Sequence, residues 1–372
     1  MNPAGASEAT GGLPALPDFP WDSLAAETAT ARAHPDGVVD LSVGTPVDPV
    51  PGVVAAALKD AWNSPGYPQT HGTPPLRRAV VEALSRRFGA AGLESDAVLP
   101  TIGSKELVAW LPTLLGLGGS TVAIPALAYP TYEVGALLAG CEAVRVPDDE
   151  PLPPGVRLVW LNSPSNPTGR VLPVGALADR VAEARSLGAV VASDECYLGL
   201  PGPGSEPVSV LDPRVHGGSL EGLLAVHSLS KTSQLAGYRA AFCAGDPALV
   251  AGLLAVRKHA GMIVPRPIQE AMVAALSDDL HVAETRQRYD ERRAVLRPAL
   301  EKAGLRIDHS EAGLYLWATD DRPCRETVAR LAGLGILVAP GEFYGPAGAR
   351  HVRIALTASD ERIGAAATRL AA

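Results

Sequence analysis

Short apolar runs alternate with helical segments along most of the chain. Four runs are rich in Val, Leu and Ala, as expected for strands buried on both faces, and they cover residues 121–125, 156–161, 189–193 and 223–227. Helical patterns occupy 131–139 and 173–186, where Pro173 suits a first helical turn and Gly188 a C-terminal stop. Strands that alternate with helices predict an α/β fold with a parallel sheet covered by helices.

The last hundred residues follow a different pattern. Residues 268–304 form a long charged helical segment, and three short apolar runs follow it at 314–318, 336–339 and 352–356. Glycines, prolines and a helical stretch separate these runs, which predicts a smaller α+β unit. We therefore expect an N-terminal arm that joins the small domain, a large domain and a small C-terminal domain, at 1–47, 48–265 and 266–372.

Composition and charge narrow the function classes. The 372 residues are 47% hydrophobic and 19% charged, which is typical of a globular protein, and the net charge of -8 argues against nucleic acid or an anionic membrane as the main partner. No apolar run is long enough to span a bilayer. Residues 1–12 lack the features of a signal peptide, and we expect them to be a mobile terminus. The four cysteines are far apart and follow no zinc-binding pattern: Cys141, Cys196, Cys243 and Cys324. We therefore expect no metal site, and we expect the protein to lie in the reducing cytoplasm.

One lysine stands out from the five in the chain. Lys231 lies in the segment HSLSKTSQLAGYR, directly after the apolar run at 223–227. A lysine at the C-terminal end of a strand faces the crevice where α/β folds bind ligands. Partial burial there lowers the pKa of an amine, so that it can attack an aldehyde. Ser228, Ser230 and Arg239 supply donors for a phosphate. Taken alone, the segment fits equally well a surface lysine in a Ser-rich turn.

Polar or aromatic residues also follow the other predicted strands. Asp194 and Tyr197 come after the run at 189–193, the turn NSPSNPTG (162–169) follows 156–161, and Tyr129 follows 121–125. Each has a structural alternative, namely a helix cap, a plain turn and core packing. A Gly-Ser-Lys segment at 103–105 precedes a helical stretch and presents free backbone N–H groups, although most such segments merely cap a helix.

These motifs, in this order, resemble the class I/II aminotransferases, which depend on pyridoxal phosphate (PLP) and have fold type I. The resemblance implies a large domain with a mostly parallel seven-stranded sheet between helices, and a smaller α+β domain. It implies that Lys231 holds PLP as an imine and moves the substrate proton, while Asp194 pairs with the ring nitrogen. The other implied cofactor residues contact the ring, its 3'-oxygen or the phosphate: Tyr129, Asn166, Tyr197, Gly103, Ser104, Lys105, Ser228 and Arg239.

The resemblance extends to the substrate and to a second subunit. Arg353, in the run HVRIAL, would bind the substrate α-carboxylate, with Gly44 and Asn166 beside it. Out of context, Arg353 fits a surface strand better. Tyr67 would reach the phosphate bound by a neighbouring subunit, which implies a homodimer with shared active sites.

Several segments resemble the N-succinyldiaminopimelate aminotransferases of lysine and diaminopimelate biosynthesis, among them PDFPWDSLA and GSKELVAWLPTLLGLG. The implied reaction moves an amino group between glutamate, which becomes 2-oxoglutarate, and N-succinyl-2-amino-6-oxopimelate. Alternatives are an aspartate or broad-specificity aminotransferase, a C–S β-lyase and a non-catalytic PLP-binding regulator. Such regulators usually carry a DNA-binding domain, and we expect none within residues 1–21. Five basic residues are candidates for binding the distal carboxylate of the substrate: His71, Arg257, Lys258, His259 and Arg266. Each of them fits a solvated surface position as well.

Overall fold

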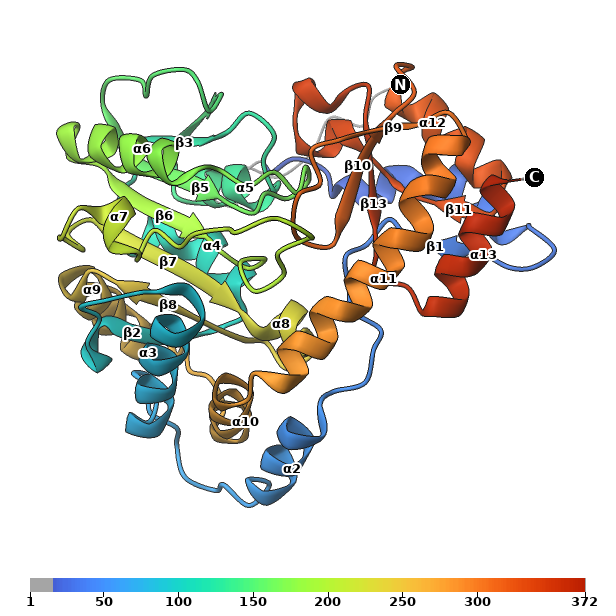
Figure 1. Ribbon diagram of the computed structural model, residues 1–372. Coiled ribbons are helices and arrows are strands. Elements are labelled where there is room, and N and C mark those ends of the chain that lie inside the picture. The colour runs from blue at the N-terminus through green and yellow to red at the C-terminus, as the bar shows by residue number, and fades with distance from the viewer. Residues whose placement is uncertain (1–15, 372) are drawn as a thin grey trace, which may run out of the picture.

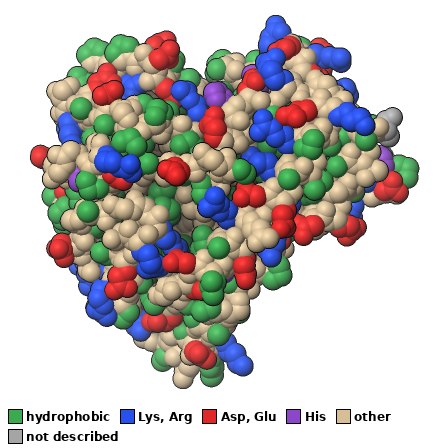
Figure 2. Space-filling model, in the orientation of Figure 1, with side chains coloured by type: hydrophobic (Ala, Val, Ile, Leu, Met, Phe, Trp, Pro, Cys, Tyr) green, Lys and Arg blue, Asp and Glu red, His purple; other side chains and the backbone are tan. Residues whose placement is uncertain are grey.

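The computed structural model describes residues 16–371. The expected mobile terminus at 1–12 lies outside these residues. In the described part no helix is long and apolar enough to cross a membrane. On the face drawn in Figure 2, acidic and basic side chains are interspersed among the described residues.

A seven-stranded sheet forms the larger lobe of the molecule (Figure 1). Its strands, in spatial order, are β2 (Val98–Ile102), β8 (Ala240–Gly245), β7 (Leu223–Ser228), β6 (Val190–Asp194), β5 (Val156–Asn162), β3 (Thr121–Pro125) and β4 (Glu142–Val146). From β7 to β4 all neighbours are parallel, whereas β8 is antiparallel to both β7 and β2. The mostly parallel seven-stranded sheet is confirmed, and all four predicted runs are strands in it.

Both faces of this sheet are covered because its side chains alternate between two apolar cores. In β5, Leu158 and Trp160 face one core, while Val159 and Leu161 face the other. The first core contains α4 (Ser104–Leu114), α5 (Thr131–Leu138) and α9 (Pro247–Ala260). The second contains α2 (Gly52–Asp60), α3 (Pro74–Phe88), α6 (Val174–Ser186) and α10 (Arg266–Ser277).

The smaller lobe has its own sheets and its own core. A four-stranded antiparallel sheet has the order β12 (Ala339–Pro340), β13 (Val352–Ala355), β10 (Tyr315–Thr319) and β9 (Arg306–Asp308). A second, parallel pair joins β1 (Val39–Asp40) to β11 (Ile336–Leu337), so the N-terminal segment packs with the C-terminal residues. The helices around these sheets are α1 (Ala25–Arg32), α12 (Cys324–Gly333), α13 (Asp360–Leu370) and part of α11 (Leu280–Lys302).

The segment predicted as one helix at 268–304 is two helices, which is a correction. The chain leaves helical geometry at Asp278, whose carboxylate accepts hydrogen bonds from the N–H groups of Leu280 and His281 at the start of α11. Helix α10 packs against α2 and α3 and contributes Met272 to the core of the larger lobe. Helix α11 then runs from this lobe to the smaller one (Figure 1). We therefore propose that the domain boundary lies within α11 and not at residue 265.

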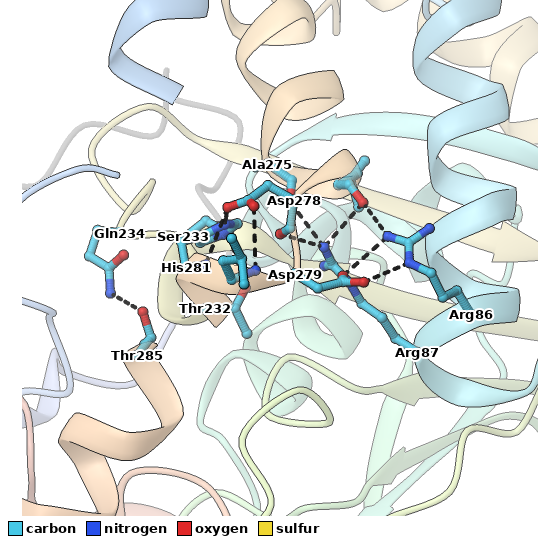
Figure 3. Close-up of polar contacts among 12 residues, drawn as sticks. Arg86, Arg87, Thr232, Ser233, Gln234, Ala275, Asp278, Asp279, His281 and Thr285 are labelled. Carbon is cyan, nitrogen blue, oxygen red and sulfur yellow. Dashed lines mark hydrogen bonds and ion pairs between the residues drawn. The ribbon is translucent and has the colours of Figure 1, made fainter. Parts of the chain in front are cut away.

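Polar contacts fix the start of α11 in the larger lobe (Figure 3). The Asp279 carboxylate accepts hydrogen bonds from Nε of Arg86 at 2.7 Å and from Nε of Arg87 at 2.6 Å, both on α3. Ser233 contacts His281 at 2.8 Å, and Gln234 donates to Thr285 at 3.2 Å. The segment that follows Lys231 is therefore held against α11.

Candidate active site

A cavity of about 1170 Å³ lies between the carboxyl ends of the central strands and the smaller lobe. It gathers residues from the N-terminal segment, from the starts of α4 and α5, from the ends of β6 and β7, and from β13. Eleven of the thirteen predicted site residues line it: Gly44, Ser104, Lys105, Tyr129, Asn166, Asp194, Tyr197, Ser228, Lys231, Arg239 and Arg353.

Lys231 enters the cavity from the short helix α8 (Leu229–Thr232), which follows β7 directly. Ser228 caps this helix by accepting a hydrogen bond from the N–H of Ser230 at 3.1 Å. The Lys231 amine donates to the carbonyl oxygen of Gly44. Burial is the main cause that lowers the pKa of Lys231, and the positive charges of Arg353 and Arg239 act in the same direction. A larger fraction of this amine is therefore neutral and nucleophilic than in a free lysine.

Asp194 ends β6 as a buried carboxylate that forms no ion pair with any described residue. Its oxygens accept hydrogen bonds from the Tyr132 hydroxyl at 2.9 Å and from the Cys196 N–H at 3.2 Å. Burial raises the pKa of Asp194, and these two hydrogen bonds oppose that effect. A buried carboxylate without a cation is costly, so the site suits a ligand that brings a positive N–H group.

The start of α4 faces Arg239 at one end of the cavity. Gly103 precedes α4 with a φ of 77°, and a Cβ atom at this position would collide with the Arg239 guanidinium. Only glycine therefore allows the two to approach so closely. The hydroxyls of Ser228 and Ser230 lie 2.8 Å apart beside them. Free N–H groups of a helix start, hydroxyls and a guanidinium are the donors that bind phosphate.

Arg353 lies at the opposite side, buried among tyrosines. Its guanidinium donates to Oδ1 of Asn166 at 2.9 Å and to the carbonyl of Ser42 at 2.7 Å. The guanidinium carbon is 4.1 Å from the ring centroid of Tyr315 and 5.0 Å from that of Tyr344. A fixed planar guanidinium of this kind suits bidentate binding of a carboxylate.

The loop that carries Asn166 is tied to the strand ends. Asn162 donates to the carbonyl of Asp194 at 2.9 Å and accepts from the N–H of Asn166 at 2.7 Å. The peptide bonds before Pro164 and Pro167 are cis. Asn166 and Asp194, which are 28 residues apart in sequence, are thereby placed in one constellation.

Two tyrosines complete the wall of the cavity. The Tyr197 hydroxyl lies 3.0 Å from that of Tyr315. Tyr129 meets Tyr132 edge to face, with ring centroids 5.8 Å apart. Burial raises the pKa of Tyr129 to about 12, so its hydroxyl keeps its proton at neutral pH.

Some predicted residues lie elsewhere. Tyr67 is fully exposed and does not line the cavity. Among the proposed distal carboxylate ligands, Arg257 is buried against Glu106 and cannot reach a substrate, which is a correction. The other candidates, which also do not line the cavity, are His71, Lys258, His259 and Arg266.

The sequence interpretation missed several residues of the site. Tyr132 lies only three positions after Tyr129, at the start of α5, and this closeness to a predicted site residue could have indicated it. Trp21, Phe343 and Arg325 line the mouth of the cavity, and no local pattern marks them.

The donors at the start of α4 suit a phosphate, the Asp194 carboxylate suits a protonated ring nitrogen, and the Lys231 amine suits an aldehyde. PLP carries all three groups in one molecule, and its dimensions suit a cavity of this size. The fold and the site therefore define a PLP-dependent enzyme of fold type I.

The family follows from sequence comparison. A family model described as "Aminotransferase class I and II" matches residues 36–370, and the chain belongs to this family. It is 62% identical over 369 residues to a probable aminotransferase of Mycobacterium tuberculosis, covering 98% of this chain and 88% of that protein. It is 59% identical over 359 residues to the 4-dedimethylamino-4-oxo-anhydrotetracycline transaminase OxyQ of Streptomyces rimosus, covering 95% of this chain and 99% of that protein.

A solved structure agrees with this assignment. The probable N-succinyldiaminopimelate aminotransferase of Thermus thermophilus superposes with a TM-score of 0.85 at 29% identity, covering 95% of this chain and 99% of that one. The expected class I/II family, fold type and PLP dependence are confirmed.

We predict that the apoprotein captures added PLP at pH values where an ordinary lysine is still protonated. Because burial lowers the pKa of Lys231, the capture rate should fall with decreasing pH around a midpoint below the usual 10.5. The rate is followed by visible absorption between about pH 6 and pH 11. A midpoint at the ordinary lysine value would show that the amine is solvated.

We predict that Tyr132→Phe weakens PLP binding about tenfold, because it removes a hydrogen bond that favours the carboxylate form of Asp194 and opposes the effect of burial on its pKa. Tyr289→Phe is the matched control, since Tyr289 is buried in the smaller lobe and its hydroxyl has no partner among the described residues. Dissociation constants measured by cofactor titration give the comparison. Equal effects of the two substitutions on the dissociation constant would show that Tyr132 has no specific role in PLP binding.

Proposed function

We propose that the enzyme transfers an amino group between glutamate and N-succinyl-2-amino-6-oxopimelate. The buried Arg353 at one side of the cavity carries the proposal, together with Lys105, which also lines the cavity and forms no ion pair among the described residues. Both substrates share an α-carboxylate, so one arginine serves both halves of the reaction. The similarity to the probable N-succinyldiaminopimelate aminotransferase of Thermus thermophilus supports the same substrate class.

The roles of the side chains follow from their positions. When bound, PLP supplies an electron-withdrawing ring that accepts the electron pair released as the substrate Cα–H bond breaks. Lys231 Nζ, whose pKa is lowered by burial, would take the Cα proton and return it to the carbon that was the aldehyde of free PLP. Asp194 would hold a proton on the ring nitrogen, and Tyr197 would donate to the ring oxygen. Arg353 holds the α-carboxylate and orients the Cα–H bond.

The distal carboxylate needs a second cation, for which we propose Lys105. Its side chain is exposed, lines the cavity and forms no ion pair in the described part of the chain. Its amine lies 5.8 Å from the ring centroid of Phe19, at the mouth. Arg325 also lines the mouth, but its Nε donates to Glu342 at 2.6 Å, so its charge is already paired.

A second candidate is the amination of a bulky cyclic ketone. The Streptomyces rimosus relative, which is 59% identical, is a transaminase of such a substrate, 4-dedimethylamino-4-oxo-anhydrotetracycline. The mouth is also aromatic: the Trp21 ring centroid lies 5.6 Å from that of Phe19 and 5.2 Å from that of Phe343. A flat ring system could pack against these residues.

We predict that glutamate converts the bound cofactor to its pyridoxamine form, and that N-succinyl-2-amino-6-oxopimelate converts it back. Lys105→Ala should lower kcat/KM for this acceptor about tenfold but leave kcat/KM for pyruvate, which lacks a distal carboxylate, unchanged. Lys59→Ala, on α2 away from the cavity, is the control. Single-turnover absorption gives both rates.

The same assay separates the alternatives. Pyruvate released from cystathionine without an oxoacid would indicate a C–S β-lyase. Faster turnover of oxaloacetate than of N-succinyl-2-amino-6-oxopimelate would favour an aspartate or broad-specificity enzyme. If only a polycyclic ketone converts the pyridoxamine form back to PLP, the second candidate is favoured. Absence of any conversion would leave a PLP-binding protein without transferase activity.

We also propose a homodimer with shared active sites. Tyr67 is fully exposed and Trp62 is 79% exposed, on the segment that follows α2. Large exposed aromatic side chains that lie close together in sequence are typical of a protein interface. In this arrangement Tyr67 would reach the phosphate bound by the other subunit.

A mixed dimer tests this arrangement. Lys231→Ala and Tyr67→Ala subunits, co-expressed with different tags, should form a heterodimer with one doubly defective and one intact site. We predict about half of the wild-type activity, well above that of either parent homodimer. If Tyr67 instead contacts the phosphate bound by its own subunit, both sites of the heterodimer are defective. Its activity will then not exceed that of the Tyr67→Ala homodimer.

A further inference from the structure

A buried ion pair lies directly behind the start of α4. Nη1 of Arg257, on α9, donates to Oε1 of Glu106 at 2.7 Å, and Nη2 donates to Oε2 at 3.3 Å. Arg257 is 0% exposed, and the Glu106 side chain is 17% exposed. Neither residue lines the cavity, so neither is a ligand of the substrate. Buried ion pairs contribute little to the free energy of folding, because the loss of hydration offsets the attraction between the charges. The presence of this pair therefore suggests a role other than general stability.

Glu106 shapes the turn that leads into the phosphate end of the cavity. It is the third residue of α4, and its carboxylate accepts a hydrogen bond at 3.3 Å from the N–H of Ile102, the last residue of β2. This bond is similar to one half of a capping box, but it reaches the residue before the N-cap Gly103 and not the N-cap itself. Gly103 and Ser104, between these two partners, are thereby held in place.

Arg257 is itself fixed from a third direction. Its Nη2 donates at 3.3 Å to the carbonyl of Met262, which directly follows Gly261, the C-cap of α9. The guanidinium therefore joins the end of α9 to the first turn of α4. Because the pair is buried, its charges act through a medium of lower dielectric constant than water.

The charges of Glu106 and Arg257 have opposite effects on the binding of a phosphate at the start of α4. An uncompensated carboxylate in the first turn of α4 would repel a phosphate dianion and would compete for the same helix dipole. The adjacent guanidinium cancels that repulsion while the carboxylate keeps its hydrogen bond to Ile102.

We propose that Glu106 and Arg257 are positioning residues for the cofactor phosphate: Glu106 sets the shape of the turn at Gly103 and Ser104, and Arg257 neutralises and orients Glu106. The proposal goes beyond the transfer reaction and does not depend on which substrate is used. It concerns only the end of the cofactor that carries the phosphate.

The test compares PLP with pyridoxal, which lacks the phosphate. Apoprotein is titrated with each compound, and the dissociation constants are read from the quenching of intrinsic fluorescence. Arg257→Leu should weaken PLP binding about tenfold or more and pyridoxal binding less than about twofold. The reason is that the Glu106 carboxylate, no longer neutralised, repels the phosphate, which only PLP carries. Glu106→Gln leaves a guanidinium without its anion, so the preference for PLP over pyridoxal should increase.

The double variant completes the cycle. Arg257→Leu combined with Glu106→Gln removes both charges and should restore most of the preference for PLP. Arg292→Leu is the matched control: Arg292 is 3% exposed, pairs with Asp48 at 2.7 Å and does not line the cavity. It should lower the thermal midpoint of unfolding and leave the preference unchanged.

Two results would overturn the proposal. One is equal weakening of PLP and pyridoxal in Arg257→Leu, which would indicate a merely structural pair. The other is an unchanged or reduced preference for PLP in Glu106→Gln, which would contradict the proposed charge effect. If Arg257→Leu does not fold, the nearly isosteric Glu106→Gln decides alone. Activity is not needed for either readout, so a wrong substrate assignment would leave the result intact.

Discussion

The burial of the Lys231 amine at the carboxyl edge of the sheet is the constraint on which the site depends. An amine taken out of water favours its neutral form, and the guanidinium of Arg353 acts in the same direction. The Asp194 carboxylate on the neighbouring strand is buried as well, without an ion pair in the described part of the chain. These two uncompensated groups make the cavity complementary to a ligand that brings an aldehyde and a protonated ring nitrogen.

The two lobes are both needed to create that burial. The N-terminal segment supplies the Gly44 carbonyl above Lys231, and it is held to the smaller lobe by the β1–β11 pair. The smaller lobe supplies Arg353 from β13. Helix α11, fixed to α3 at one end and packed on α13 at the other, joins the lobes (Figures 1 and 3). A change in the angle between the lobes would therefore change the solvation of the amine.

The sequence predicted those features that depend on local periodicity. Buried parallel strands are continuous apolar runs, so their ends, and with them Asp194 and Lys231, could be placed. Strands β2 and β8 were not singled out, because one contains Pro100 and the other is rich in alanine and pairs antiparallel. Pairings between distant residues had no local signal: Glu106 and Arg257 are 151 positions apart, and Tyr132 and Asp194 are 62 apart. Arg257 therefore looked like a surface or substrate residue.

Chemical reduction of the PLP-loaded protein tests the central claim most directly. Borohydride converts an imine between lysine and PLP to a stable secondary amine, and mass spectrometry of the digested protein then identifies the labelled peptide. With five lysines in the chain, the account predicts stoichiometric label on Lys231. Label on Lys105 or another lysine, or no label on a protein that binds PLP, would contradict it.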